Sequence, residues 1–227
     1  MASLTTPTTV LPQTVLPTDW TLADVQQHVG GVALERIRLY PPPGMATVED
    51  ALRIHDREDR LYELVDGVLV EKIMATYESL LASFLIHLIH QFLDENPLGI
   101  LLAPDGALRI LPEKMRIPDV SFISWDKFPN RKLPRDRVFA VAPDLAVEIL
   151  SEGNTPQEME LKRDEYFRAG VRLVWFIDPE NRSAQVYTSR DACEPLDENG
   201  ALSGREVLPG FELPLKALLD KVERLSQ

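Results

Sequence analysis

The sequence has few cysteines, histidines and aromatic residues, and these scarcities exclude several classes of protein. Cys193 is the only cysteine, so the chain can form neither an internal disulfide nor a cysteine-based zinc site. Inside the body of the chain, the longest uncharged stretch, residues 79–91 with neighbouring Leu93, contains two histidines and is too short to span a bilayer. Residues 1–18 contain no lysine or arginine and no core apolar block. We therefore expect no secretory signal, no membrane contact and a cytoplasmic location.

Positive charge is also scarce. The 24 lysines and arginines face 36 aspartates and glutamates, which gives a net charge of −12 and argues against indiscriminate nucleic-acid binding. One segment, residues 126–137, departs from this balance, because it contains only two acidic residues and five basic ones: Lys127, Arg131, Lys132, Arg135 and Arg137. This basic segment is either a solvated loop or a loop that faces a phosphate backbone.

Length and composition indicate one ordinary folded domain, since 227 residues with 44% hydrophobic content can bury a substantial core. Residues 1–18 contain six threonines and three prolines, which predicts a flexible tail. Residues 19–46 are interpreted as an N-terminal helical extension, and residues 47–227 as the main domain.

Periodicity and capping signals predict the elements of that domain. The Asp66-Gly67 pair between two apolar runs is a strong hairpin signal. Capping residues and three- to four-residue spacing predict helices at 22–29, 47–55, 77–93, 156–169 and 215–225. Further strands are expected at 100–103, 107–111, 120–123, 145–150, 171–177 and 184–188. This order predicts a mixed α/β (α+β) fold, a single domain with one central mixed sheet flanked by helices.

Two carboxylates need an explanation. Glu148 is the only charged residue between 145 and 150, in a run typical of a strand covered on both faces. A carboxylate there requires a cation or a hydrogen-bond donor, so it is either part of a structural ion pair or part of a site. Asp119 follows Pro118 at the start of another strand, where an aspartate is most often a turn residue and occasionally a ligand.

Two further residues lie on predicted inward-facing positions. At 100° per residue, Lys162 falls on the helix stripe that contains Met159 and Tyr166, the face expected to cover the sheet. If this helix packs on the strand before it, the Lys162 ammonium would lie near Glu148, although lysines on such a stripe often extend to solvent. Glu63 lies in an otherwise apolar strand. It is either a further candidate carboxylate of the site or a solvent-facing residue of an alternating strand.

The order of several short motifs resembles the Uma-two family of restriction-endonuclease-like proteins, which is frequent in cyanobacteria and other bacteria. The motifs are LYELVDG, RIPDVSFIS, PDLAVEILSEGNTP, KRDEYFRAGVRLVWFIDP and LPGFELPL, and they cover roughly residues 47–218. Each is short, but their order and spacing are specific. The family is similar to the PD-(D/E)xK nuclease superfamily, which implies a central mixed sheet flanked by helices, Mg²⁺ or Mn²⁺ as cofactor and DNA as substrate.

The resemblance assigns roles to the candidate residues. Asp119 matches the superfamily's motif aspartate, Glu148 its second acidic metal ligand, and Glu63 the acidic residue of its first motif; the Ile149 carbonyl would supply a further ligand. The usual lysine position, two residues after the acid, is Leu150 here, and Lys162 on the following helix matches the family's substitute. Where many relatives have a histidine after the hairpin, this chain has Tyr77.

Three functions are compatible with these patterns. The first is a Mg²⁺-dependent DNA endonuclease with Asp119, Glu148, Lys162 and Glu63 at its centre and the basic segment on the DNA backbone. The second is a non-catalytic interaction or regulatory module, as a homodimer, which the net charge and the displaced lysine favour. The third is a metal phosphohydrolase of smaller phosphate esters, which a cleft too closed for duplex DNA would favour.

Overall fold

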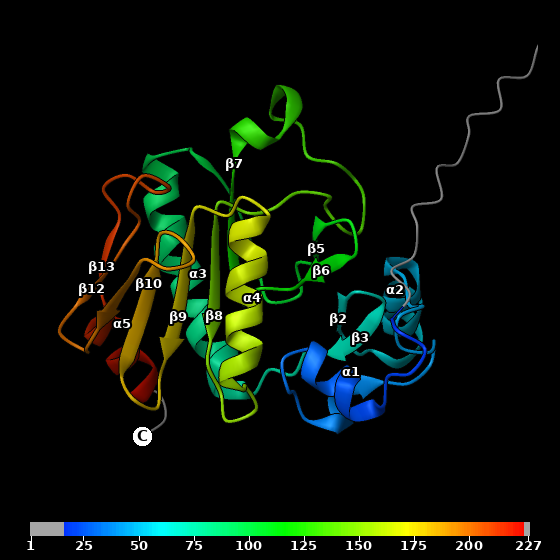
Figure 1. The fold of residues 1–227 in the computed structure, drawn as a ribbon. Coiled ribbons are helices and arrows are strands. Elements are labelled where there is room, and N and C mark those ends of the chain that lie inside the picture. Colours follow the sequence, from blue (N-terminus) through cyan, green and yellow to red (C-terminus); the bar gives the residue numbers. More distant parts are fainter. Residues whose placement is uncertain (1–15, 225–227) are drawn as a thin grey trace, which may run out of the picture.

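The main sheet of the computed structural model, which describes residues 16–224, has six strands in the order β11-β10-β9-β8-β7-β4 (Figure 1). Only β8 and β9 run parallel, and every other neighbouring pair is antiparallel. The strands are β4 Gly99–Leu102, β7 Val120–Ser124, β8 Leu145–Ile149, β9 Leu173–Asp178, β10 Ser183–Tyr187 and β11 Cys193–Leu196. The predicted mixed sheet is thereby confirmed.

Two smaller sheets accompany it. An antiparallel sheet has the order β1-β3-β2-β6-β5, and β12 (Ala201–Ser203) pairs with β13 (Glu212–Pro214). The five strands are β1 Ile37–Arg38, β2 Tyr62–Val65, β3 Val68–Glu71, β5 Leu108–Leu111 and β6 Lys114–Arg116. The strands are therefore divided among several sheets, whereas the sequence suggested one. The Asp66-Gly67 hairpin joins β2 to β3, and the other neighbour of β2 is β6 rather than β7 or β8.

Helices cover both faces of the main sheet (Figure 1). Along β8, Leu145, Val147 and Ile149 belong to the core packed by α3 and α5, whereas Ala146 belongs to the core that contains Met159 and Tyr166 of α4. Since side chains alternate along a strand, Glu148 shares the α4 face with Ala146. The helices are α1 Leu22–His28, α2 Val48–Glu58, α3 Thr76–Glu95, α4 Pro156–Arg168 and α5 Leu215–Glu223.

The predicted helices and hairpin are confirmed with end shifts of a few residues. Thr21 and Thr47 form capping boxes with Asp24 and Asp50, and Thr155 caps α4. Asp66 and Gly67 have φ of 48° and 76°, as a tight hairpin turn requires. Among residues 16–224, no helix is both long and apolar enough to cross a membrane. Most of the tail predicted at 1–18 lies outside the described residues.

The segment predicted as an N-terminal extension packs against the rest of the fold. Val25, Val29 and Ile37 form a small core with Val65, Val68 and Val70 of the second sheet, and β1 pairs with β3. A short 3₁₀ helix, Leu34–Arg36, ends at a buried arginine that reaches α4.

Candidate active site

Glu148 on β8 meets two side chains of α4. The Lys162 ammonium lies 2.9 Å from Glu148 Oε2, and the Tyr166 hydroxyl donates a hydrogen bond of 2.5 Å to Oε1. Lys162 and Tyr166 are four residues apart, so they lie one above the other on the same helix face. The contact predicted between Lys162 and Glu148 is therefore confirmed, and Lys162 does not extend to solvent, since its side chain is 1% exposed.

Asp119 lies beside Glu148 at the edge of the neighbouring strand. Its backbone N–H donates to the Val147 carbonyl, and its Oδ2 accepts a 2.6 Å hydrogen bond from the Ile149 N–H. Its Oδ1 lies 2.7 Å from the Lys72 ammonium, which also lies 3.4 Å from Glu148 Oε2. Burial raises the pKa of Asp119, and Glu148 adds to this while Lys72 opposes it. The two carboxylates thus share one cation.

Lys72 is the site residue that the sequence analysis missed. It immediately follows β3, and its side chain is only 8% exposed. Burial lowers the pKa of Lys72, but Glu148 and Asp119 outweigh burial, so its net pKa lies above the usual lysine value. A lysine at the end of an apolar strand was the available signal, but nothing in the spacing indicated that β3 ends beside β7 and β8.

Glu63 on β2 faces Lys162 from the other side. Its Oε1 lies 3.3 Å from Lys162 and accepts from the Ile117 N–H, while its Oε2 accepts a 2.7 Å hydrogen bond from Arg116. Burial raises the pKa of Glu63, but Lys162 and Arg116 outweigh it and hold the net pKa far below the ordinary value. Glu63 is 1% exposed, so the solvent-facing interpretation was wrong.

The site is part of a larger network of buried charges. Arg116 also bonds Glu165, which pairs with Lys114, and Arg36 makes a two-pronged ion pair with Glu158 near the start of α4. The charged side chains here that are less than 10% exposed are Arg36, Lys72, Lys114, Arg116 and Lys162, with Glu63, Asp119, Glu148, Glu158 and Glu165. Asp66, whose side chain is 19% exposed, also pairs with Lys114. Each of these buried charges has a partner of opposite sign, and a buried charge without one would be strongly destabilising.

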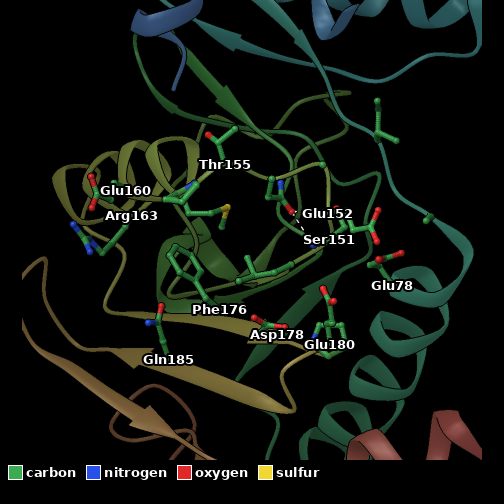
Figure 2. A pocket seen from close by; sticks show the side chains of 18 of the residues that line it. Glu78, Ser151, Glu152, Thr155, Glu160, Arg163, Phe176, Asp178, Glu180 and Gln185 are labelled. Atoms are coloured by element: carbon green, nitrogen blue, oxygen red, sulfur yellow. Dashed lines mark hydrogen bonds between the residues drawn. The ribbon is translucent and has the colours of Figure 1, made fainter. Parts of the chain in front are cut away.

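A small cavity of about 10 Å³ reaches the carboxylates, and its lining includes Asp119, Glu148, Ile149, Lys72 and Lys162. A second, much larger cavity of about 980 Å³ borders it (Figure 2). Both cavities are lined by Arg36, Ile73, Glu78, Ser151 and Asn154. The buried carboxylates therefore lie next to a space large enough for a ligand.

The donors at the site suit a hard cation. Asp119 Oδ1 and Glu148 Oε2 converge on the Lys72 ammonium, so their oxygens already surround a positive charge, and carboxylate oxygens are the ligands Mg²⁺ prefers. Glu63 is held by Arg116 and Lys162 rather than turned toward this point. Within residues 16–224, no cluster of three or more histidine, cysteine, aspartate or glutamate side chains could hold a metal ion by itself.

The basic segment lies elsewhere. It follows the C-terminal end of β7, whereas Asp119 precedes the N-terminal end of that strand. Lys127 bonds the Ala142 and Pro143 carbonyls, and Arg137 pairs with Asp56. The other three, Arg131, Lys132 and Arg135, are exposed. The structure thus unites Glu63, Asp119, Glu148 and Lys162 and leaves the five basic residues apart from them.

A mixed sheet with a glutamate on β8, an aspartate directly before the neighbouring β7 and a lysine from the next helix is the arrangement of a restriction-endonuclease-like α+β fold. A solved structure with this fold is a "putative nuclease belonging to DUF820" from Anabaena variabilis, with a TM-score of 0.65 and 20% identity over 72% of this chain and 92% of that chain. A model of the Uma2 family, described as "Putative restriction endonuclease", matches residues 48–216. The chain belongs to the Uma2 family. Among curated proteins, the comparison found no similar sequence.

Proposed function

We propose that this protein is a metal-dependent endonuclease that hydrolyses phosphodiester bonds in DNA. The observation that carries the proposal is the convergence of Asp119, Glu148 and Lys162 at one buried point beside a large cavity. Membership of the Uma2 family supports a nuclease, and buried ionisable clusters beside a cavity are typical of catalytic sites.

Asp119, Glu148 and the Ile149 carbonyl would hold the divalent cation, Mg²⁺ or Mn²⁺. When bound, such an ion stabilises negative charge on the scissile phosphate. Two carboxylates and one carbonyl suffice as protein ligands for Mg²⁺, because this ion usually keeps several waters.

The remaining side chains have roles that follow from their contacts. Lys162 would orient the attacking water or stabilise charge that develops on the phosphate. Glu63 accepts from Arg116 and lies 3.3 Å from Lys162, so it would hold the Lys162 ammonium in position. Tyr166 would hold the second oxygen of Glu148. The basic segment would contribute backbone contacts without sequence choice.

A second candidate is a non-catalytic module that keeps the nuclease fold. The observation in its favour is that lysines already neutralise both carboxylates, with Lys72 in the position where the cation would lie. In this alternative the charge network serves stability only.

The test combines metal binding with DNA hydrolysis on the same samples. We would titrate wild type and Glu148→Gln with Mn²⁺ and Mg²⁺ by calorimetry, and assay nicking of supercoiled plasmid and cleavage of single-stranded DNA. Glu165→Gln is the matched control, because Glu165 is equally buried and ion-paired in the same network but does not line the small cavity.

For a nuclease we expect that wild type and Glu165→Gln bind metal and cleave DNA, and that Glu148→Gln loses at least about 100-fold in rate, as for removal of a strong transition-state contact. A folded wild type that binds no metal at millimolar concentration would favour the non-catalytic module. Cleavage that survives in Glu148→Gln would refute the assigned site.

A further inference from the structure

The outermost strand of the main sheet, β4, has one unpaired side. Within residues 16–224, β7 is the only strand that pairs with it. Directly before β4, the Leu98 carbonyl accepts from the N–H of Trp125, the residue that follows β7. Hydrogen-bonded and non-bonded pairs alternate along an antiparallel ladder, so every second residue from Leu98 onward bonds β7. The N–H groups and carbonyls of Gly99 and Leu101 therefore point away from the sheet.

The other edge strands of the two larger sheets have features that prevent strand pairing. β11 contains Pro195, which has no N–H, and Glu194, which is exposed and pairs with Arg205. β1 has only two residues, and on β5 the N–H of Arg109 donates to the Phe139 carbonyl. Short length, charge, proline and cover are the means by which proteins protect sheet edges. β4, with the sequence Gly-Ile-Leu-Leu, has neither charge nor proline.

Charge also distinguishes the surroundings of β4. The net charge of −12 makes two copies of this chain repel each other over most of their surfaces. Residues 96–104, which contain β4, carry no charge. A second copy can therefore approach this edge more closely than it can approach an acidic surface.

From these observations we propose that β4 pairs antiparallel with β4 of a second copy of this chain, which makes the two main sheets continuous. A two-fold axis between the two Ile100 residues sets Gly99 of each copy opposite Leu101 of the other. Each outward N–H then meets an outward carbonyl, because the edge is complementary to itself under this axis. Leu98, which is 36% exposed, would lie opposite Leu102 of the second copy and be covered by it.

The pairing fixes how the two candidate sites are oriented. An axis that relates antiparallel strands of one sheet is perpendicular to that sheet, so the α4 faces of both copies point to the same side. Ile100 packs on the cluster that contains Met159 and Tyr166 of α4, the face that Glu148 shares. Both Glu148 carboxylates would thus lie on one side of the joined sheet. The interface itself does not depend on the proposed nuclease function, so either can fail without the other.

The first test is sedimentation velocity on the full chain over a range of protein and salt concentrations. Leu101→Pro removes an outward N–H without removing a bond to β7, and proline is tolerated at such edge positions. Leu101→Ala is the matched control, because it removes the same side chain from the same hydrophobic cluster and keeps the N–H.

We expect wild type to dimerise with a dissociation constant of about 10 µM, because one short strand per copy makes a small interface. Salt should strengthen the dimer, since it screens the repulsion between like charges. Leu101→Pro should weaken dimerisation at least about tenfold, and Leu101→Ala less than about threefold. A wild type that is still monomeric at about 100 µM, or a dimer that Leu101→Pro leaves unchanged, would overturn the proposal.

A disulfide test covers the case in which Leu101→Pro does not fold. In a Cys193→Ser background, which removes the exposed native thiol, Ile100→Cys is compared with Leu102→Cys under mild oxidation. Both residues are partly buried against the same cluster. The two Ile100 residues would form a non-bonded pair with Cα atoms about 4.5 Å apart, within disulfide range, whereas the two Leu102 residues would be four positions out of register, roughly 14 Å apart.

The register therefore predicts a cross-linked dimer for Ile100→Cys and not for Leu102→Cys on a non-reducing gel. Absence of cross-linking in Ile100→Cys, or equal cross-linking in both variants, would overturn the pairing of β4 with β4.

Discussion

At the scale of single residues, the decisive feature is the position of the Lys72 ammonium. It lies 2.7 Å from Asp119 and 3.4 Å from Glu148, where an added cation would find the same oxygens. An ammonium and a divalent ion cannot both occupy this point, so metal binding requires Lys72 to move. Lys72 would then be free to face the phosphate, whose charge it complements.

Lys72→Met tests this competition. We expect the free energy of unfolding to fall by about 3 kcal/mol, because two buried carboxylates lose their shared cation. We also expect Mn²⁺ to bind about tenfold more tightly than in wild type and to raise the melting temperature of the variant more than that of wild type. Thermal melts with and without Mn²⁺, together with calorimetry, measure both effects.

Lys114→Met is the control, because Lys114 is equally buried and pairs with Asp66 and Glu165 outside the site. It should lose stability without a change in metal affinity. If Lys72→Met binds Mn²⁺ no better than wild type, Lys72 does not compete with the metal.

At the scale of elements, the packing of α4 on β8 was predictable from the sequence, whereas the ion pair of Asp119 with Lys72 was not. Alternation along 145–150 and the 100° period of 156–169 are local patterns, and together they placed Lys162 against Glu148. The position of Lys72 beside Asp119 and Glu148 depends on how the two sheets pack together, and local sequence periodicity carries no information about that packing. β6 was missed because its three residues include two cations, Lys114 and Arg116, whose burial depends on carboxylates distant in sequence.

The hairpin turn between β2 and β3 gives a prediction on pH. Asp66 accepts from His28 at 2.9 Å and from Lys114 at 2.6 Å. Burial opposes the effect of these partners, which nevertheless lower the pKa of Asp66 from 3.8 to about 2. Because the folded pKa is lower, the stabilisation is complete above about pH 4 and disappears as the pH falls through 2.

Asp66→Asn should therefore cost about 1 kcal/mol at pH 7, after allowance for solvent screening, and almost nothing near pH 2. Asparagine tolerates the positive φ of this position, so the turn itself is retained. Urea unfolding of wild type and variant between pH 2 and 7 measures the difference. A difference that is constant over this range would exclude an ionic contribution of Asp66.

At the scale of the whole molecule, negative charge dominates. The net charge is −12, and the large cavity is lined by five carboxylates. Any nucleic acid must therefore approach through local positive charge, and the exposed part of the basic segment, Arg131, Lys132 and Arg135, is the candidate.

Replacement of Arg131, Lys132 and Arg135 by alanine tests this approach. If all three contact phosphates of a single strand, the slope of log K against log salt should decrease in magnitude by about 2. The control replaces three exposed arginines on helices, Arg53, Arg57 and Arg168. Binding is measured by fluorescence anisotropy from about 50 to 200 mM salt. Equal slopes of log K against log salt in the two variants would mean that the basic segment is a solvated loop that does not contact phosphates.

The ion pair between Arg36 and Glu158 has a consequence for where this protein can be shortened. Family similarity begins at residue 48, yet Arg36 lines both cavities and neutralises a glutamate at the start of α4. The Gly30 carbonyl also accepts a hydrogen bond from Thr155, the residue that caps this helix. A truncated chain that began at the family boundary would retain Glu158 without its cation. We therefore expect that a shortened version needs residues 30–36 to keep Arg36 paired with Glu158 and the Gly30 carbonyl bonded to Thr155.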